Sequence, residues 1–212
     1  MAWIATRFLW MAYSLPLLWY VARQARSYGW FAIRKALKKT VGAYRFAQGR
    51  STRTSFIIVD AQTVMSTDLA KNSGYDGGKM ISGIKRHMVV DINGLPQAIH
   101  INRANVSDRE GALAMFSLSN QMLDSVQRVI VDGGYTGQDF SDQVKLILDA
   151  STTLAKRNEL HTFKVLPQRW IIGRSWSWLD KCSRLWKNCE RKLNSSLQMV
   201  LLDYLVLAFR RY

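Results

Sequence analysis

The stretch Phe-Ile-Ile-Val-Asp-Ala-Gln-Thr (56–63) predicts a strand from the interior of a sheet that ends in a carboxylate, Asp60. The later stretch Arg-Val-Ile-Val-Asp-Gly-Gly-Tyr-Thr-Gly (128–137) has the same form and places Asp132 at the end of its apolar run. Runs of Ile and Val are typical of buried strands, and a carboxylate left unpaired at the edge of the core would be costly. A shared divalent cation such as Mg²⁺ could compensate both charges, because it binds carboxylate oxygens and keeps waters for substrate phosphates. The alternative is that both aspartates cap turns, a position that Asp favours.

The order of the expected elements favours an α/β protein with a mixed sheet. In this layout the first and fourth strands can lie side by side and parallel, which would bring Asp60 and Asp132 within reach of one metal cluster. Asn93-Gly94 predicts a tight hairpin, and Asn105 and Asp108 are expected to cap the helix that comes after them. The expected strands are 56–60, 84–91, 96–101, 127–132 and 151–156, and the expected helices are 17–48, 109–123, 137–148, 170–192 and 195–210.

The charge of the chain is large and unevenly distributed, with 30 Lys and Arg against 15 Asp and Glu and a net charge of +15. Residues 1–59 hold ten basic residues and no acidic one, residues 60–160 hold ten basic and twelve acidic, and residues 161–212 hold ten basic and three acidic. A near-neutral middle that contains both aspartates is therefore flanked by two basic regions. This pattern favours a polyanionic partner, nucleic acid above all; a basic surface kept for solubility is the alternative.

The N-terminal part holds an uncharged run at 8–22 that contains Pro16. The run is shorter than the roughly 20 residues that span a bilayer. We therefore expect a buried helix or an N-terminal remnant, with a membrane anchor or signal peptide as the alternative. A polar linker at 48–55 separates this part from the rest of the chain, which predicts a basic helical segment at 1–54 and a compact domain at 55–212.

Cys182 and Cys189 are the only cysteines. Seven residues apart on one expected helix, they would lie about 10 Å apart along its axis, too far for a mutual disulfide. We expect them to be small apolar residues of the core in a reducing compartment.

Six segments carry a recognisable order of motifs: FIIVDAQTV (56–64), GYDGGKMISGIKRHMVVDINGLP (74–96), ANVSDREGA (104–112), VDGGYTG (131–137), FKVLPQRWII (163–172) and RSWSWLDKCSRLWKNCERK (174–192). Together they resemble the DDE transposases of bacterial insertion sequences, in particular the insertion-sequence-5 type. The resemblance spans about 55–192 and extends weakly back to about Tyr13. The family normally carries a further N-terminal region, so the resemblance leads us to expect that this chain is shortened at its N-terminus.

The resemblance implies a ribonuclease-H-like fold in which three acidic residues bind two Mg²⁺ or Mn²⁺ ions. One metal would activate the attacking water or DNA 3′-hydroxyl, and the other would stabilise the leaving oxygen. Asp60 matches the first acid and Asp132 the second. The implied partners are DNA, as the terminal inverted repeats of the element and its target, and a second copy of the chain in a homodimer. No small-molecule substrate or membrane is implied, and the expected location is the cytoplasm, in association with the nucleoid.

The third acidic position departs from the family pattern. The family's last block resembles Arg-Trp-Val-Val-Glu-Arg-Thr, whereas this chain reads Arg-Trp-Ile-Ile-Gly-Arg-Ser at 169–175, so Gly173 stands where the glutamate is expected. Glycine offers no ligand. Asp180 is seven residues further on, about 10 Å along a helix, and Glu190 is farther, so neither is expected to replace it.

Four basic residues in these motifs are expected to contact DNA phosphates: Lys85, Arg86, Arg169 and Arg174. Guanidinium groups suit phosphate oxygens, while a solvated strand face is the alternative for the first two. His87 is expected to be a packed or hydrogen-bonded strand residue rather than a metal ligand. Trp176, Trp178 and Leu179 belong to an apolar stripe that predicts core packing.

Two functions are expected from these patterns. The first is metal-dependent DNA strand cleavage and transfer, impaired in this chain because Gly173 replaces the third acid. The second is non-catalytic DNA binding by a transposase remnant. A membrane-associated basic protein would rest on residues 8–22 alone.

Overall fold

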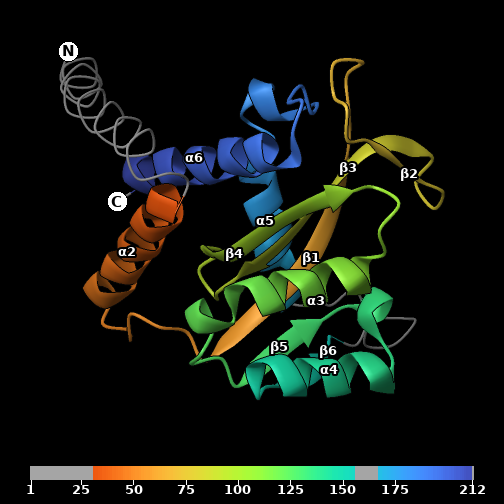
Figure 1. Ribbon diagram of the computed structural model, residues 1–212. Helices are drawn as coiled ribbons and strands as arrows, with labels where there is room; N and C mark the ends of the chain where they lie inside the picture. The colour runs from red at the N-terminus through yellow and green to blue at the C-terminus, as the bar shows by residue number, and fades with distance from the viewer. Residues whose placement is uncertain (1–30, 156–166, 212) are drawn as a thin grey trace, which may run out of the picture.

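The computed structural model describes residues 31–155 and 167–211 and shows a six-stranded mixed sheet with helices on both faces (Figure 1). β1 lies between the antiparallel β3 and the parallel β5, and β6 continues the parallel part. β2 and β4 both pair with the other side of β3. The strands are β1 (Phe56–Met65), β2 (Gly74–Asp76), β3 (Ile81–Val90), β4 (Pro96–Arg103), β5 (Arg128–Val131) and β6 (Ser151–Leu154).

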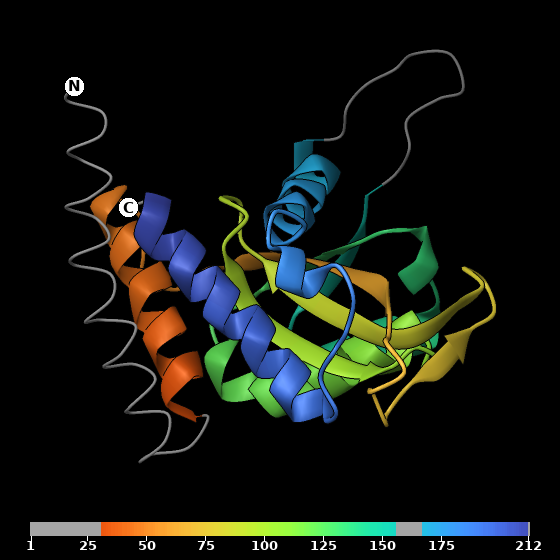
Figure 2. The same ribbon diagram turned by 90° about the horizontal axis from the view of Figure 1, so that it is seen from above.

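The helices divide between the two faces of the sheet. α3 (Asp108–Ser119) and α4 (Gln138–Leu148) cover one face, over a core that includes Ile57, Val59 and Val129. α2 (Phe31–Ala47), α5 (Pro167–Leu179) and α6 (Leu193–Arg211) pack on the other face, where the core includes Ile58, Met88 and Ile130. Figure 2 shows α2 and α6 lying side by side, with α5 farther along the sheet. Short 3₁₀ turns lie at Asn120–Met122 (η1), Gly133–Tyr135 (η2) and Ser183–Leu185 (η3).

This arrangement confirms the expected fold class of an α/β protein with a mixed sheet flanked by helices. The first and fourth expected strands are neighbours and parallel, with Ile57 opposite Val129 and Ile58 opposite Ile130. The alternation of side chains along a strand places these two pairs on opposite faces, in the two separate cores. The same alternation decides which face the site aspartates occupy.

The expected hairpin at Asn93-Gly94 is confirmed. The Gly94 amide donates to the Asp91 carbonyl over 2.9 Å, and Gly94 has a φ of +78°, which glycine adopts without strain. The helix cap was predicted one residue too late. Ser107 is the N-cap of α3 and forms a reciprocal capping box with Glu110, a Ser-x-x-Glu signal that is legible in the sequence.

The expected helix at 170–192 is wrong, because α5 ends at Leu179. The chain then returns to the end of β1, where the Asn188 amide donates to the Met65 carbonyl over 2.8 Å and the Thr67 amide donates to the Asn188 carbonyl over 2.9 Å. Those strand-like contacts exclude a continuous helix. Cys182 and Cys189 are both free thiols, but they lie in this non-helical segment and not on one helix.

The basic N-terminal part is described from residue 31 onward. Ile33, Leu37 and Val41 of α2 are buried in the same core as β3, α5 and α6. The helix expected at 17–48 is therefore confirmed for 31–47, whereas its earlier part and the run at 8–22 lie outside the described residues. The division at residues 54 and 55 remains a prediction. Within 31–155 and 167–211, no helix is long and apolar enough to cross a membrane.

Candidate active site

Asp60 and Asp132 lie on one face of the sheet, Asp60 within β1 and Asp132 directly after the parallel β5. The prediction that the first strand ends at Asp60 is wrong, because β1 continues along β3 to Met65 and Asp60 lies in its middle, opposite Met88. Ile58 and Ile130 are opposite each other and both face the core under α5. Two residues further along, the same alternation brings Asp60 and Asp132 to that face, and the backbone of Asp132 is still extended, at φ −92° and ψ −179°. Their carboxylates are close enough for the charge on Asp132 to raise the pKa of Asp60. The sequence prediction that these two acids come together is therefore met by the strand pairing.

The Asp60 carboxyl group has a raised pKa. Burial is the main cause and repulsion by Asp132 adds to it, while hydrogen bonds from the Ala61 amide and the Trp176 side chain act in the opposite direction. A divalent cation between the two carboxylates would relieve both the burial of charge and the repulsion. The donor set thus fits one hard cation held by carboxylate oxygens.

Asp132 also caps the turn behind its strand. Its Oδ1 accepts a hydrogen bond of 3.0 Å from the Gly134 amide, at the start of η2. The turn-capping alternative is therefore observed for Asp132, and it orients one oxygen of the carboxylate. It does not exclude metal binding, since a carboxylate has about four lone-pair sites.

Trp176 is a contact of Asp60 that the sequence did not reveal. Its indole Nε1 donates to Asp60 Oδ2 over 3.0 Å, and its side chain is only 7% exposed. The apolar stripe that predicted core packing for Trp176 is confirmed, but a stripe gives no sign that the polar edge of one ring meets an acid. Trp176 follows Gly173, where the resemblance places a third acid, by three residues, which is about one helical turn.

Gly173 lies in α5 on the face that turns toward β1. Trp176 contacts Asp60, and Asp180, just beyond the helix, accepts a 3.4 Å hydrogen bond from Gln62, so positions 173, 176 and 180 follow one helix face along the strand. Gly173 is exposed, and no atom outside its own turn lies within 4 Å of the position that a Cβ would take. Position 173, where the resemblance leads us to expect a third acid, therefore has room for a glutamate side chain. Among the described residues, no three His, Cys, Asp or Glu side chains are grouped so as to hold a metal ion.

Replacing Trp176 with Phe should raise the pKa of Asp60 further. Phenylalanine keeps the ring in the core but removes the N–H donor that favours the charged carboxylate. The measurement is an NMR titration of the Asp60 side-chain carboxyl carbon. Trp178→Phe in the same helix is the matched control, and an unchanged Asp60 titration in Trp176→Phe would show that the hydrogen bond has no electrostatic effect.

Lys85 and Arg86, two of the expected DNA contacts, are buried side chains with partners inside the protein. Lys85 Nζ lies 2.9 Å from Asp108 Oδ1 and donates to the Val106 carbonyl over 2.9 Å. Arg86 is 2% exposed and donates to the Leu185 carbonyl over 2.9 Å; burial lowers its pKa to about 10. Contact with a phosphate would require either side chain to give up these partners.

Arg174 is half-buried and Arg169 lies in the first turns of α5. The guanidinium of Arg174 stacks on the rings of Trp170 and Trp178, at 4.5 and 5.2 Å, and donates to the Asn93 carbonyl over 2.9 Å. The side chain of Arg169 lies outside the described residues. The DNA-binding role of all four basic residues remains a prediction.

His87 is fully buried and hydrogen-bonded, as expected, with its Nε2 3.1 Å from Asn102 Oδ1. Burial lowers its pKa to about 4. The unfolded chain therefore binds this proton near pH 6.5 and the folded chain only near pH 4, so stability is lost as the pH falls through that window. The loss attributable to His87 should approach about 3 kcal/mol.

Urea unfolding between pH 7 and pH 4 measures this loss, and the comparison is with His87→Gln, which does not titrate. The slope of stability against pH should be shallower in the variant. Equal slopes would assign the loss to other groups, such as His100, whose pKa burial also lowers.

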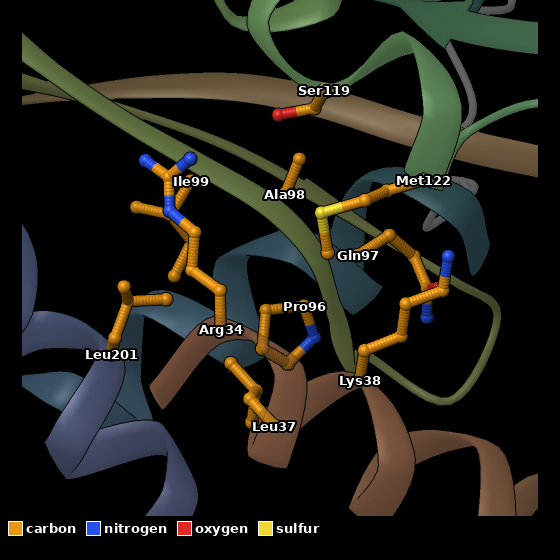
Figure 3. Close-up of a pocket in the computed structure, with 10 residues that line it drawn as sticks. All are labelled: Arg34, Leu37, Lys38, Pro96, Gln97, Ala98, Ile99, Ser119, Met122 and Leu201. Atoms are coloured by element: carbon orange, nitrogen blue, oxygen red, sulfur yellow. The ribbon is translucent and has the colours of Figure 1, made fainter. Parts of the chain in front are cut away.

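A pocket with about 450 Å³ of space, part of it open to solvent, lies away from the two aspartates. Figure 3 shows that side chains of α2, β4, α6, η1 and the end of α3 line it, with Arg34 and Lys38 as its charged groups. No acidic residue lines it. The two carboxylates on β1 and after β5 are therefore not part of this pocket.

The fold and the site together define an α/β protein that presents two carboxylates on one face of adjacent parallel strands, one within β1 and one directly after β5. A family model described as transposase DDE domain matches residues 51–209, and the chain belongs to this family. No match is found among curated proteins. Among solved structures, a similar chain occurs in the cryo-EM structure of the simian T-cell lymphotropic virus intasome in complex with the PP2A regulatory subunit B56 gamma. It is 14% identical, with a TM-score of 0.47, and the alignment covers 70% of this chain and 47% of that chain.

Proposed function

We propose that this chain is built for the DDE transposase reaction, metal-dependent cleavage and transfer of DNA strands at the ends of an insertion sequence of the insertion-sequence-5 type. The observation that carries the proposal is the pair Asp60 and Asp132 on adjacent parallel strands, in a chain that belongs to the transposase DDE domain family. The proposed partners are the terminal inverted repeats and target DNA, bound by a homodimer of this chain in the cytoplasm at the nucleoid.

Asp60 and Asp132 would hold Mg²⁺ or Mn²⁺ through carboxylate oxygens, with Trp176 and Gly134 fixing one oxygen of each. When bound, such ions activate the attacking water or 3′-hydroxyl and stabilise the leaving oxygen. The chain's own part is to orient the carboxylates and to bind the phosphate backbone. Exposed cations follow α5 in the segment that returns to β1: Lys181, Arg184, Lys187, Arg191 and Lys192.

Gly173 leaves this site with two of its three expected ligands, so we expect strand cleavage to be slow or absent in the chain as it stands. A two-metal site needs the geometry that the third carboxylate helps to fix. Non-catalytic DNA binding is the second candidate function. The vacant third position and the exposed basic segment after α5 favour it.

Incubation with a duplex that carries the terminal inverted repeats of the element separates the two functions. Cleavage that requires Mg²⁺ or Mn²⁺ and is lost in Asp132→Asn supports the enzyme. Salt-sensitive binding with no cleavage at any metal concentration supports the binding protein. The absence of both would overturn the proposal.

A further inference from the structure

The turn between β3 and β4, residues 91–95, is held from within by a buried aspartate. Asp91 is fully buried, and its Oδ1 accepts hydrogen bonds of 2.9 Å from the Asn93 amide and 3.0 Å from the Leu95 amide. With these amides bound to Asp91, the carbonyls of Asn93 and Gly94 serve as acceptors for other elements. The turn is therefore held in one conformation, and it contacts other elements of the fold on two sides.

Arg45, near the C-terminal end of α2, binds the first side of this turn. Its Nη1 lies 2.5 Å from Asp91 Oδ2, and its Nε and Nη2 donate to the carbonyls of Ser51 and Arg53 over 2.9 and 3.2 Å. Both charged side chains are buried, at 8% and 0% exposure. One guanidinium thus joins α2 and the segment after it to the turn.

The helix α5 binds the second side. Arg174 Nη2 donates to the Asn93 carbonyl over 2.9 Å and Ser175 Oγ to the Gly94 carbonyl over 2.7 Å. The fit is close, because a Cβ at Gly94 would come within 2.7 Å of Ser175 Oγ. Ser175 is followed directly by Trp176, the residue that donates to Asp60.

We propose that Arg45 and Asp91 are positioning residues for α5: through the turn 91–95 they fix the helix that meets Asp60 through Trp176 and carries the third acidic position. The N-terminal helix is thereby a part of the active-site framework and not only a basic arm. The importance of this placement for catalysis rests on the proposed function, whereas the placement itself is testable without metal or DNA.

The test is hydrogen exchange of the Trp176 indole N–H, followed by NMR in the full chain, with the backbone amide of Val129 in β5 as an internal reference, because Val129 packs in the other core. Arg45→Gln should accelerate Trp176 exchange about tenfold and leave Val129 unchanged, because loss of the Arg45–Asp91 contact loosens α5 locally. Arg53→Gln is the matched control, since its guanidinium makes only an exposed pair with Asp124. It should change neither signal.

Arg45→Gln leaves Asp91 buried without its partner and could prevent folding. The double variant Arg45→Met/Asp91→Asn avoids this, because Asn keeps the oxygen that caps the turn and no charge remains buried. It should show the same faster exchange at Trp176. Exchange at Trp176 that is unchanged, or that rises equally at Trp176 and Val129, would overturn the proposal and leave the proposed function untouched.

Discussion

Gly173→Glu should raise the rate of Mg²⁺- or Mn²⁺-dependent cleavage of inverted-repeat DNA by at least about 100-fold, since a metal ligand contributes several kcal/mol to transition-state stabilisation and each 1.36 kcal/mol is tenfold. The substitution restores a carboxylate on the helix face that meets Asp60 through Trp176. The backbone accepts it, because the Cβ position is open. Replacing a helical glycine also stabilises α5 by up to about 1 kcal/mol.

Gly173→Gln is the control, because it matches glutamate in size and in helix propensity but lacks the charge. It should stabilise α5 without restoring cleavage. In the Gly173→Glu background, Asp60→Asn should abolish the gain. Equal rates for the wild type, Gly173→Gln and Gly173→Glu would show that position 173 is not a ligand position in this chain.

Gly111→Ala should destabilise the fold by about 2 kcal/mol or more, in spite of the higher helix propensity of alanine. Gly111 is buried in α3, and a Cβ there would lie 2.1 Å from His87 Nε2 and 2.2 Å from Cε1. The imidazole cannot move aside, because it is fully buried and bound to Asn102. Urea unfolding at pH 7 measures the change.

The effect of Gly111→Ala on the free energy of unfolding should change sign when the His87 imidazole is removed. In a His87→Ala background the added methyl fills part of the space left by the imidazole, so Gly111→Ala should be neutral or stabilising there. Gly77→Ala serves as the neutral comparison, since a Cβ at Gly77 meets nothing within 4 Å. If Gly111→Ala still destabilised the fold in the His87→Ala background, the cause would lie in α3 itself and not in a clash with the imidazole.

The part of the fold that the sequence predicts is local. Runs of Ile and Val predict the strands β1, β3, β4 and β5, and Asn93-Gly94 predicts the hairpin between β3 and β4. Both signals are readable because strand propensity and turn chemistry act over a few residues. The strand β2 was missed, since Gly74–Asp76 has no strand pattern and pairs only because β3 lies beside it. The end of α5 was also missed, because the contacts of Asn188 with β1 come from residues more than 120 positions away.

In the candidate site, too, local sequence patterns were predictable and long-range contacts were not. Asp60 and Asp132 were predictable, because each ends an apolar run and the order of elements makes their strands neighbours. The burial of Lys85 was not, since its partner Asp108 comes from the start of α3 and a cationic side chain by itself indicates exposure. Arg45 and Asp91 likewise meet across 46 positions of sequence, with no local pattern to join them.

The most direct test of a metal site shared by Asp60 and Asp132 is a Mn²⁺ titration followed by paramagnetic broadening of backbone NMR signals, in the wild type and in Gly173→Glu. The wild type should bind weakly, with broadening centred on residues 60 and 132 and lost in Asp60→Asn. Gly173→Glu should bind at least about tenfold more tightly than Gly173→Gln, with broadening that extends to residue 173. Broadening that is absent from residues 60 and 132, or that persists in Asp60→Asn, would contradict a metal site shared by these two aspartates.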